Sequence, residues 1–88
     1  MDVLIIEPLE AEVMDWLRAR HAVRHAPELA RDTREFRRAL YNVRSVILPS
    51  FLAVDAHTLH YAPALVAVGR VSGGAENIDL QACGRAGV

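Results

Sequence analysis

Four short apolar runs, separated by amphipathic segments, constrain the fold of this chain more than any other feature. They lie at residues 3–6, 22–25, 45–48 and 65–68. A spacing of about twenty residues leaves room for one helix between consecutive strands. Runs without polar alternation, such as Val3–Ile6, are typical of strands that are buried on both faces of a parallel sheet. Since parallel strands are joined by right-handed crossovers, the pattern predicts an α/β fold, a three-layer parallel sheet with helices on both faces.

The segments between the runs carry helix signals. The first helix is predicted to end near residue 20, and we expect its apolar stripe to lie on the sheet; the stripe is formed by Leu9, Val13, Trp16 and Leu17. The next run, at residues 22–25, becomes polar early and is followed by Pro27, so we expect it to be an edge strand. Later caps are expected at Asp32 with Glu35, at Asp55, at Asn77 or Asp79, and at Gly87 as a left-handed C-cap.

The charge balance excludes several classes of function. The ten cationic side chains are all Arg, and eleven acidic side chains leave a formal net charge of −1. This balance argues against a nucleic-acid binder and against a polybasic membrane binder. The arginines that alternate with acidic residues on expected helix faces are interpreted as solvated; they are Arg18, Arg20, Arg31, Arg34, Arg37 and Arg38.

The single cysteine and the short apolar runs indicate the cellular compartment of the protein. Cys83 cannot form an internal disulfide. No apolar stretch approaches roughly 18 residues, the length of a membrane span. We therefore expect a cytoplasmic protein, in which Cys83 is a buried structural thiol on the last helix. A length of 88 residues limits the chain to one small domain.

Ligand-binding loops are expected at the carboxyl edge of the predicted sheet, beyond the ends of the strands. The candidate segments are Glu7 with Pro8, residues 49–51 and residues 69–76. In the last segment a strand leads through Ser72, Gly73 and Gly74 into a helix start, where backbone N–H groups converge as they do around a bound carboxylate or phosphate. On the residues alone, a purely structural turn whose glycines permit positive φ is the simpler interpretation.

Two other chemistries lack the residues that they need. His57 and His60 share a predicted helix without a third ligand nearby, and His21 and His25 fall on different elements, so no metal site is expected. A phosphorylated receiver domain needs a carboxylate after the third strand and a lysine. Here that strand ends in residues 48–50, Leu-Pro-Ser, and the chain contains no Lys.

Three blocks of sequence occur in a recognisable order: Asp2–Leu9, Val54–Leu59 and Val68–Cys83. The last block joins Gly-Arg, a small-residue turn and a helix start that reads Glu-Asn-Ile-Asp. Together the blocks resemble the D-isomer-specific 2-hydroxyacid dehydrogenases, the family that includes D-3-phosphoglycerate dehydrogenase. The resemblance extends over essentially the whole chain. It implies that residues 1–88 are the amino-terminal part of that family's flavodoxin-like substrate domain, an incomplete fold of about four β-α units.

The resemblance also implies substrate-binding residues. The family's carboxylate-binding backbone turn falls on Ser72, Gly73 and Gly74, and its post-strand substrate loop falls on residues 49–51, in which Ser50 keeps the usual hydroxyl. Pro49 stands where many members carry Arg, and Phe51 begins an apolar run. The implied substrate is therefore a small or apolar 2-hydroxy or 2-keto acid. The candidate substrate-binding residues are Ser50, Phe51, Ser72, Gly73 and Gly74; no catalytic or metal-binding residue is assigned.

The family's dinucleotide-binding domain, with its catalytic Arg, Glu and His, is not recognised in residues 1–88. The five glycines do not form the Gly-x-Gly-x-x-Gly fingerprint after a strand. We therefore expect a fragment of an NAD(P)-dependent oxidoreductase that holds no cofactor itself and is not independently catalytic. The alternative is a free-standing flavodoxin-like module for protein interaction or small-carboxylate binding.

The expected strand order also predicts self-association. With the order 2-1-3-4, the strand at residues 65–68 forms one edge of the sheet. Exposed edges with unpaired N–H and C=O groups pair readily with a second chain. We therefore expect a homodimer, formed either through this edge or by exchange of the last helix.

Overall fold

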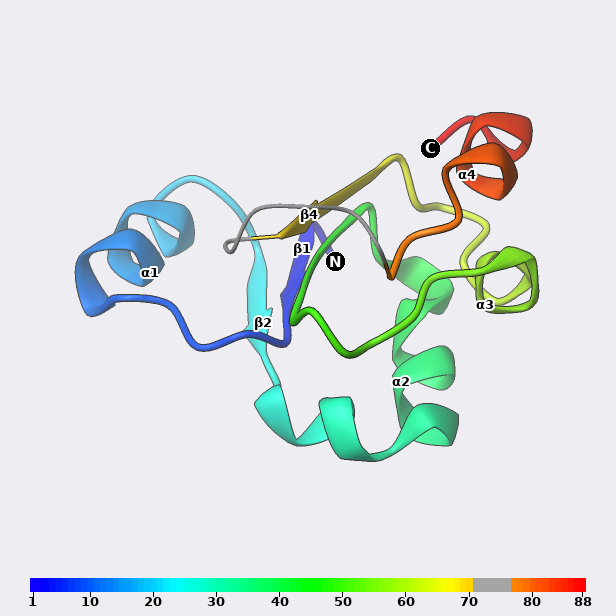
Figure 1. The fold of residues 1–88 in the computed structure, drawn as a ribbon. Helices are drawn as coiled ribbons and strands as arrows, with labels where there is room; N and C mark the ends of the chain where they lie inside the picture. The colour runs from blue at the N-terminus through cyan, green and yellow to red at the C-terminus, as the bar shows by residue number, and fades with distance from the viewer. Residues whose placement is uncertain (71–76) are drawn as a thin grey trace.

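A four-stranded parallel sheet runs through the protein, as seen in a computed structural model that describes residues 1–70 and 77–88 (Figure 1). Its strands are β1 (Val3–Ile5), β2 (Val23–His25), β3 (Ser45–Leu48) and β4 (Ala67–Arg70). The order across the sheet is β2-β1-β3-β4, and every neighbouring pair is parallel. The predicted α/β class, the strand order and the edge position of β2 are therefore confirmed.

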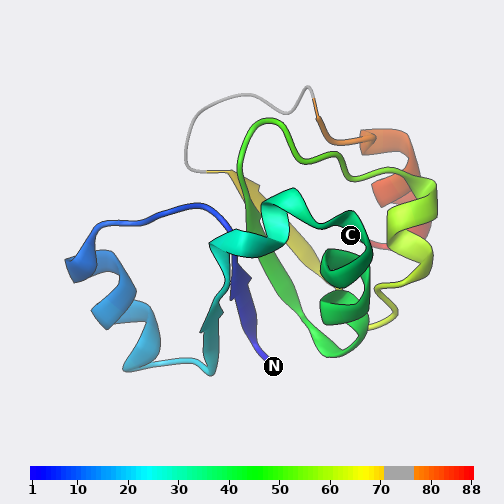
Figure 2. The same cartoon turned by 90° about the horizontal axis from the view of Figure 1, so that it is seen from below.

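Helices lie on both sides of this sheet. Helix α1 lies on one side, and the other described helices lie on the opposite side (Figures 1 and 2). The elements are α1 (Ala11–Arg18), α2 (Thr33–Ala39), α3 (Ala56–His60) and α4 (Leu80–Ala86), with short 3₁₀ helices η1 (Pro27–Arg31) and η2 (Leu40–Asn42) on either side of α2. The three-layer arrangement is confirmed, although the layers differ greatly in the number of helices that they contain.

The main hydrophobic core lies between the sheet and helices α2 to α4. From the sheet, Leu4, Val46 and Leu48 are at most 1% exposed, and Phe36 of α2 is equally buried. Burial of one such side chain contributes about 1.5–3 kcal/mol. Cys83 of α4 belongs to the same core, as predicted, and its burial raises the pKa of the thiol, with a further contribution from the negative charge of Asp79. The thiol therefore remains protonated at neutral pH.

The helix starts use the predicted capping side chains. A carboxylate oxygen accepts a hydrogen bond from the backbone N–H three residues later at Asp32, Asp55 and Asp79, with distances of 3.1, 2.8 and 3.0 Å. The bond from the Thr58 N–H is the largest cause of the lowered pKa of Asp55. Gly87 ends α4 in the left-handed conformation, with φ of 78°. Asp79 is thus the cap of α4, which leaves Asn77 for another role.

The predicted apolar stripe of α1 is wrong in part. Val13 and Trp16 are 45% and 54% exposed, whereas Met14 is buried and Leu17 is half-buried. Helix α1 is the one helix on its side among residues 1–70 and 77–88, so no neighbouring helix covers its flank. Trp16 instead packs beneath the Arg20 guanidinium, which lies 4.1 Å from the ring centroid.

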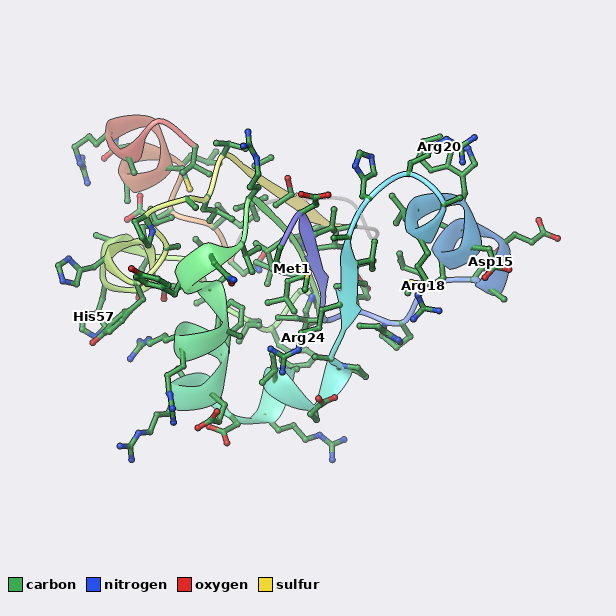
Figure 3. All side chains as sticks on the ribbon, turned by 180° about the vertical axis from the view of Figure 1, so that it is seen from behind. Met1, Asp15, Arg18, Arg20, Arg24 and His57 are labelled. Carbon is green, nitrogen blue, oxygen red and sulfur yellow. The ribbon has the colours of Figure 1, made fainter. Side chains whose placement is uncertain are left out.

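The arginine faces and β4 also depart from expectation at single positions. Arg18 at the end of α1 and Arg20 just after it are exposed, as predicted (Figure 3), but Arg37 of α2 is half-buried. The predicted strand at residues 65–68 is displaced, because Leu65 fills the core and the chain joins the sheet only at Ala67, opposite Ser45.

No helix in the described parts of the chain is long and apolar enough to cross a membrane.

Self-association through β4 stays a prediction, which two lysine variants can test. Ala67 is exposed on β4, the edge strand of the described sheet, and a charge there opposes pairing with another edge. We expect the unmodified chain to sediment as a dimer at millimolar concentration, and Ala67→Lys to sediment as a monomer. Ala64→Lys, at an exposed position before the strand, is the matched control and leaves the dimer intact.

The remaining outcomes of this experiment separate the two modes of association. If both variants remain dimeric, the contact is the exchange of α4 rather than the β4 edge. An unmodified chain that is monomeric at the same concentration contradicts both modes.

Candidate functional site

The carboxyl ends of three parallel strands meet at one edge of the sheet. Ile47 of β3 is the partner of Ile5 in β1 and of Gly69 in β4, and Leu48 lies opposite Arg70. The segment after β1 and the segment after β3 therefore leave the sheet at the same edge, from which they run in different directions, toward α1 and toward α3 (Figure 2). This is the edge at which open α/β sheets bind their ligands. The prediction that these two loops share one edge is confirmed.

The segment after β3 forms a tight turn that exposes two predicted site residues. The N–H of Leu52 donates to the carbonyl of Pro49 over 3.4 Å, which closes the turn around Ser50 and Phe51. Pro49 and Leu52 are buried, whereas Ser50 is exposed and Phe51 is 71% exposed. The buried ends hold the turn on the core, so the hydroxyl of Ser50 and the ring of Phe51 are presented to solvent.

The other predicted site residues, Ser72, Gly73 and Gly74, lie outside the described residues. The segments on either side of them are described. Arg70 ends β4 at the carboxyl edge, and Asn77 begins the stretch that leads into α4. Both flanks therefore lie near the same edge of the sheet as the Ser50 turn.

Asn77 connects this stretch to the Ser50 turn. Its side-chain amide nitrogen Nδ2 donates to the carbonyl of Pro49, over 3.3 Å, and to the carbonyl of Leu52. Its backbone carbonyl accepts from the N–H of Val54 at 2.8 Å, and Val54 forms a parallel bridge with Ile78. One amide group thus joins both ends of the turn to the chain that precedes α4.

Sequence reasoning treated Asn77 only as an alternative cap and did not detect this connection. The signal that was available is the presence of two capping residue types, Asn77 and Asp79, two positions apart before a single helix. One helix start needs one such side chain, so the other is available for a tertiary contact. The Oδ1 atom of Asn77 is buried without a hydrogen-bond partner among the described residues, which leaves an acceptor beside the Ser50 turn.

Arg70 is a second residue that the sequence analysis did not assign to the site. It is half-buried at the carboxyl end of β4, directly opposite the last residue of β3. Arg70 is thus a positively charged residue at the strand end next to the start of the Ser50 turn, while Glu7 follows β1 on the same edge. The signal that could have identified Arg70 is its place in residues 69–76, the segment expected to follow the last strand at the carboxyl edge.

The described residues do not fit a dinucleotide or a metal. Gly69 lies within β4, Gly84 within α4 and Gly87 at the end of that helix. None of these glycines joins a strand to a helix, which is the position that a dinucleotide fingerprint requires. Within residues 1–70 and 77–88, no group of three or more His, Cys, Asp or Glu side chains could hold a metal ion.

Replacement of Asn77 tests whether its amide holds the Ser50 turn against the stretch that leads into α4. Asn77→Ala removes two side-chain hydrogen bonds, so we expect the free energy of unfolding to fall by about 1–3 kcal/mol, measured by urea denaturation. Hydrogen exchange at the Val54 N–H becomes faster. Asn42→Ala, at an exposed position after α2, is the matched control, with a change of about 0.5 kcal/mol or less. Equal losses in the two variants contradict this role of Asn77.

Comparisons with known proteins agree with this architecture. The family model of the D-isomer specific 2-hydroxyacid dehydrogenase catalytic domain matches residues 3–88. Among solved structures, the chain is similar to the 2-hydroxyacid dehydrogenase from Ketogulonicigenium vulgare Y25, with a TM-score of 0.76 and 22% sequence identity. No curated protein matches the chain.

The two comparisons differ in what they cover. The structural similarity covers 99% of this chain but 27% of the Ketogulonicigenium chain, so residues 1–88 correspond to about a quarter of that dehydrogenase. At 22% identity this likeness shows the fold. The family match extends over nearly all residues of the chain. By that match, the chain belongs to the D-isomer-specific 2-hydroxyacid dehydrogenases and represents part of their catalytic domain.

Proposed function

We propose that this chain forms the substrate-carboxylate side of the active site of an NAD(P)-dependent D-2-hydroxyacid dehydrogenase. The observation that carries the proposal is the connection that Asn77 makes between the Ser50 turn and the stretch after β4. The family match over residues 3–88 supports the reaction class. Binding at this edge also agrees with the general behaviour of open α/β sheets.

Each proposed binding residue has a distinct task. The exposed hydroxyl of Ser50 donates to one carboxylate oxygen, and the backbone N–H groups of Ser72, Gly73 and Gly74 donate to the other. Arg70 adds positive charge at the end of β4. A hydrogen bond to a charged group contributes about 1.5–3 kcal/mol, so a few such donors suffice for selective binding of the anion.

The same residues support a small or apolar substrate. Pro49 is buried and uncharged at the start of the turn, and Phe51 presents an exposed ring beside the Ser50 hydroxyl. An apolar ring favours a 2-hydroxy or 2-keto acid with an uncharged tail. It offers no donor to a phosphate group on the substrate.

The hydride transfer itself is not assigned to residues of this chain. The reaction needs a bound nicotinamide and a general acid or base close to the substrate. In residues 1–70 and 77–88 no glycine joins a strand to a helix, as a dinucleotide fingerprint requires, and the role that we propose for this chain is substrate binding. We place the reaction in the cytoplasm, where a single reduced thiol such as Cys83 is usual.

A titration with pyruvate, followed by the amide resonances of the isolated chain, tests this function. We expect shifts at Ser50, Phe51 and Asn77. We also expect Ser50→Ala to weaken binding about tenfold, the effect of losing one hydrogen bond to a charged group. Ser45→Ala, at the opposite end of β3, is the matched control and leaves the affinity unchanged.

Two further measurements complete the test. Pyruvamide lacks the carboxylate, so equally strong binding of pyruvamide contradicts the proposed anion contact, as does an absence of shifts at this edge. We expect no consumption of NADH when pyruvate and NADH are mixed with the 88-residue chain. Measurable turnover contradicts the assignment of substrate binding alone.

A further inference from the structure

A pocket lies at the end of the molecule opposite to the Ser50 turn. Helices α2 and α3 run away from the carboxyl edge, so their last residues lie near the strand starts. Between these helix ends is a cavity of about 460 Å³, which is lined by Arg37, Arg38, Tyr41, His60, Tyr61 and Pro63. Small-molecule sites span about 300–1,000 Å³, so the cavity has the size of a ligand site.

Arg37 is the residue that points to a ligand. Its Cζ lies 5.8 Å from the centroid of the Tyr61 ring, and its Nε is buried without a hydrogen-bond partner among the described residues. The salt bridge found in the described part of the chain joins Arg38 to Glu35 and does not include Arg37. The charge of Asp55 interacts with Arg37 through space, without an ion pair. A half-buried guanidinium that forms no ion pair loses hydration without a hydrogen-bonded anion to replace it, and a bound anion supplies that partner.

The rest of the pocket lining adds a second cationic side chain, Arg38, and no acidic side chain. Arg38 contacts Glu35 over 3.1 Å, but both side chains are largely exposed, at 72% and 49%. Such a surface pair contributes little, so Arg38 can turn to a ligand at small cost. His60 lies edge-on to Tyr61, with 5.7 Å between ring centroids. The lining contains no carboxylate.

Two tyrosines supply flat apolar walls. Tyr41 is 71% exposed and Tyr61 is 41% exposed, although aromatic rings of this size usually bury most of their surface. Both rings line the same cavity as the two arginines. Exposed rings beside guanidinium groups match a ligand that combines a flat ring with a negative group.

We propose that this pocket binds a small anion that carries a flat ring. The negative group, a phosphate or a carboxylate, pairs with Arg37 and Arg38, and the ring packs against Tyr41 and Tyr61. The pocket lies at the opposite sheet edge from Ser50 and shares no residue with the proposed substrate site. The assignment therefore does not depend on the dehydrogenase proposal.

A titration with AMP, inorganic phosphate, adenosine and benzoate tests this site on the 88-residue chain, with amide resonances as the readout. We expect AMP to shift the amide resonances of residues 37–42 and 60–62 and to bind about tenfold more tightly than phosphate or adenosine, because it supplies both the charge and the ring. Benzoate shifts the same residues if a carboxylate serves as well as a phosphate, and its failure to do so assigns the site to phosphates.

Four variants separate this site from a general attraction to positive charge. Arg37→Gln and Arg38→Gln each weaken AMP binding about tenfold. Arg34→Gln, on the same helix outside the lining, leaves it unchanged. Tyr41→Ala reduces AMP affinity to that of phosphate and leaves phosphate binding as it was. Because Arg38 and Tyr41 are exposed, these two variants keep the fold if Arg37→Gln does not.

The proposal is overturned by any of three results. The first is an absence of localised shifts with AMP. The second is an equal loss of affinity in Arg34→Gln and Arg38→Gln, which assigns the binding to diffuse charge. The third is an unchanged affinity for AMP in Tyr41→Ala, which removes the ring from the recognition.

Discussion

The double pairing of β3 is the constraint on which the rest of the structure depends. β3 is hydrogen-bonded in parallel to β1 on one side and to β4 on the other. Parallel pairing forces the chain to cross back over the sheet after each strand, and it sends every strand end to the same edge. The core under α2 to α4 and the meeting of the site loops both follow from this one arrangement. If β4 were not paired with β3, Arg70 and the Ser50 turn would not share an edge.

A shared edge alone does not make a binding site, because loops at a sheet edge have many conformations. Asn77 restricts them by joining the carbonyls of Pro49 and Leu52 to the start of the next helical segment. The Val54 and Ile78 bridge extends the contact between the two segments. Hydrogen bonds from outside the turn therefore restrict its conformation. The hydroxyl of Ser50 makes none of these bonds and stays exposed.

Features that depend on near neighbours in the chain were predictable from the sequence. The caps at Asp32, Asp55 and Asp79 involve residues three positions apart, and the alternation of strand and helix signals predicts a parallel sheet. The order 2-1-3-4 came from the flavodoxin-like fold that the family resemblance implies. Features that depend on distant neighbours were not predictable in the same way. The stripe of α1 was misplaced because its burial depends on which helices share its side of the sheet. Leu65 belongs to an apolar run, but its side chain is buried in the core, and the pairing of β4 with β3 begins only at Ala67. The same distinction holds for the two sites. The expected topology placed Ser50 and Phe51 at the carboxyl edge of the sheet, whereas the contacts of Asn77 and the contact of Arg37 with Tyr61 became visible only in the tertiary structure.

The central claim is that Asn77 and the parallel sheet hold the Ser50 turn against the stretch that leads into α4 before any ligand is bound. Nuclear Overhauser contacts in the free protein test it most directly. The account predicts contacts between the side-chain amide protons of Asn77 and the protons of Leu52, together with contacts between Val54 and Ile78. A free protein in which β3 and β4 are paired but both sets of contacts are absent would contradict it, because the Ser50 turn would then be joined to the stretch before α4 only when substrate binds.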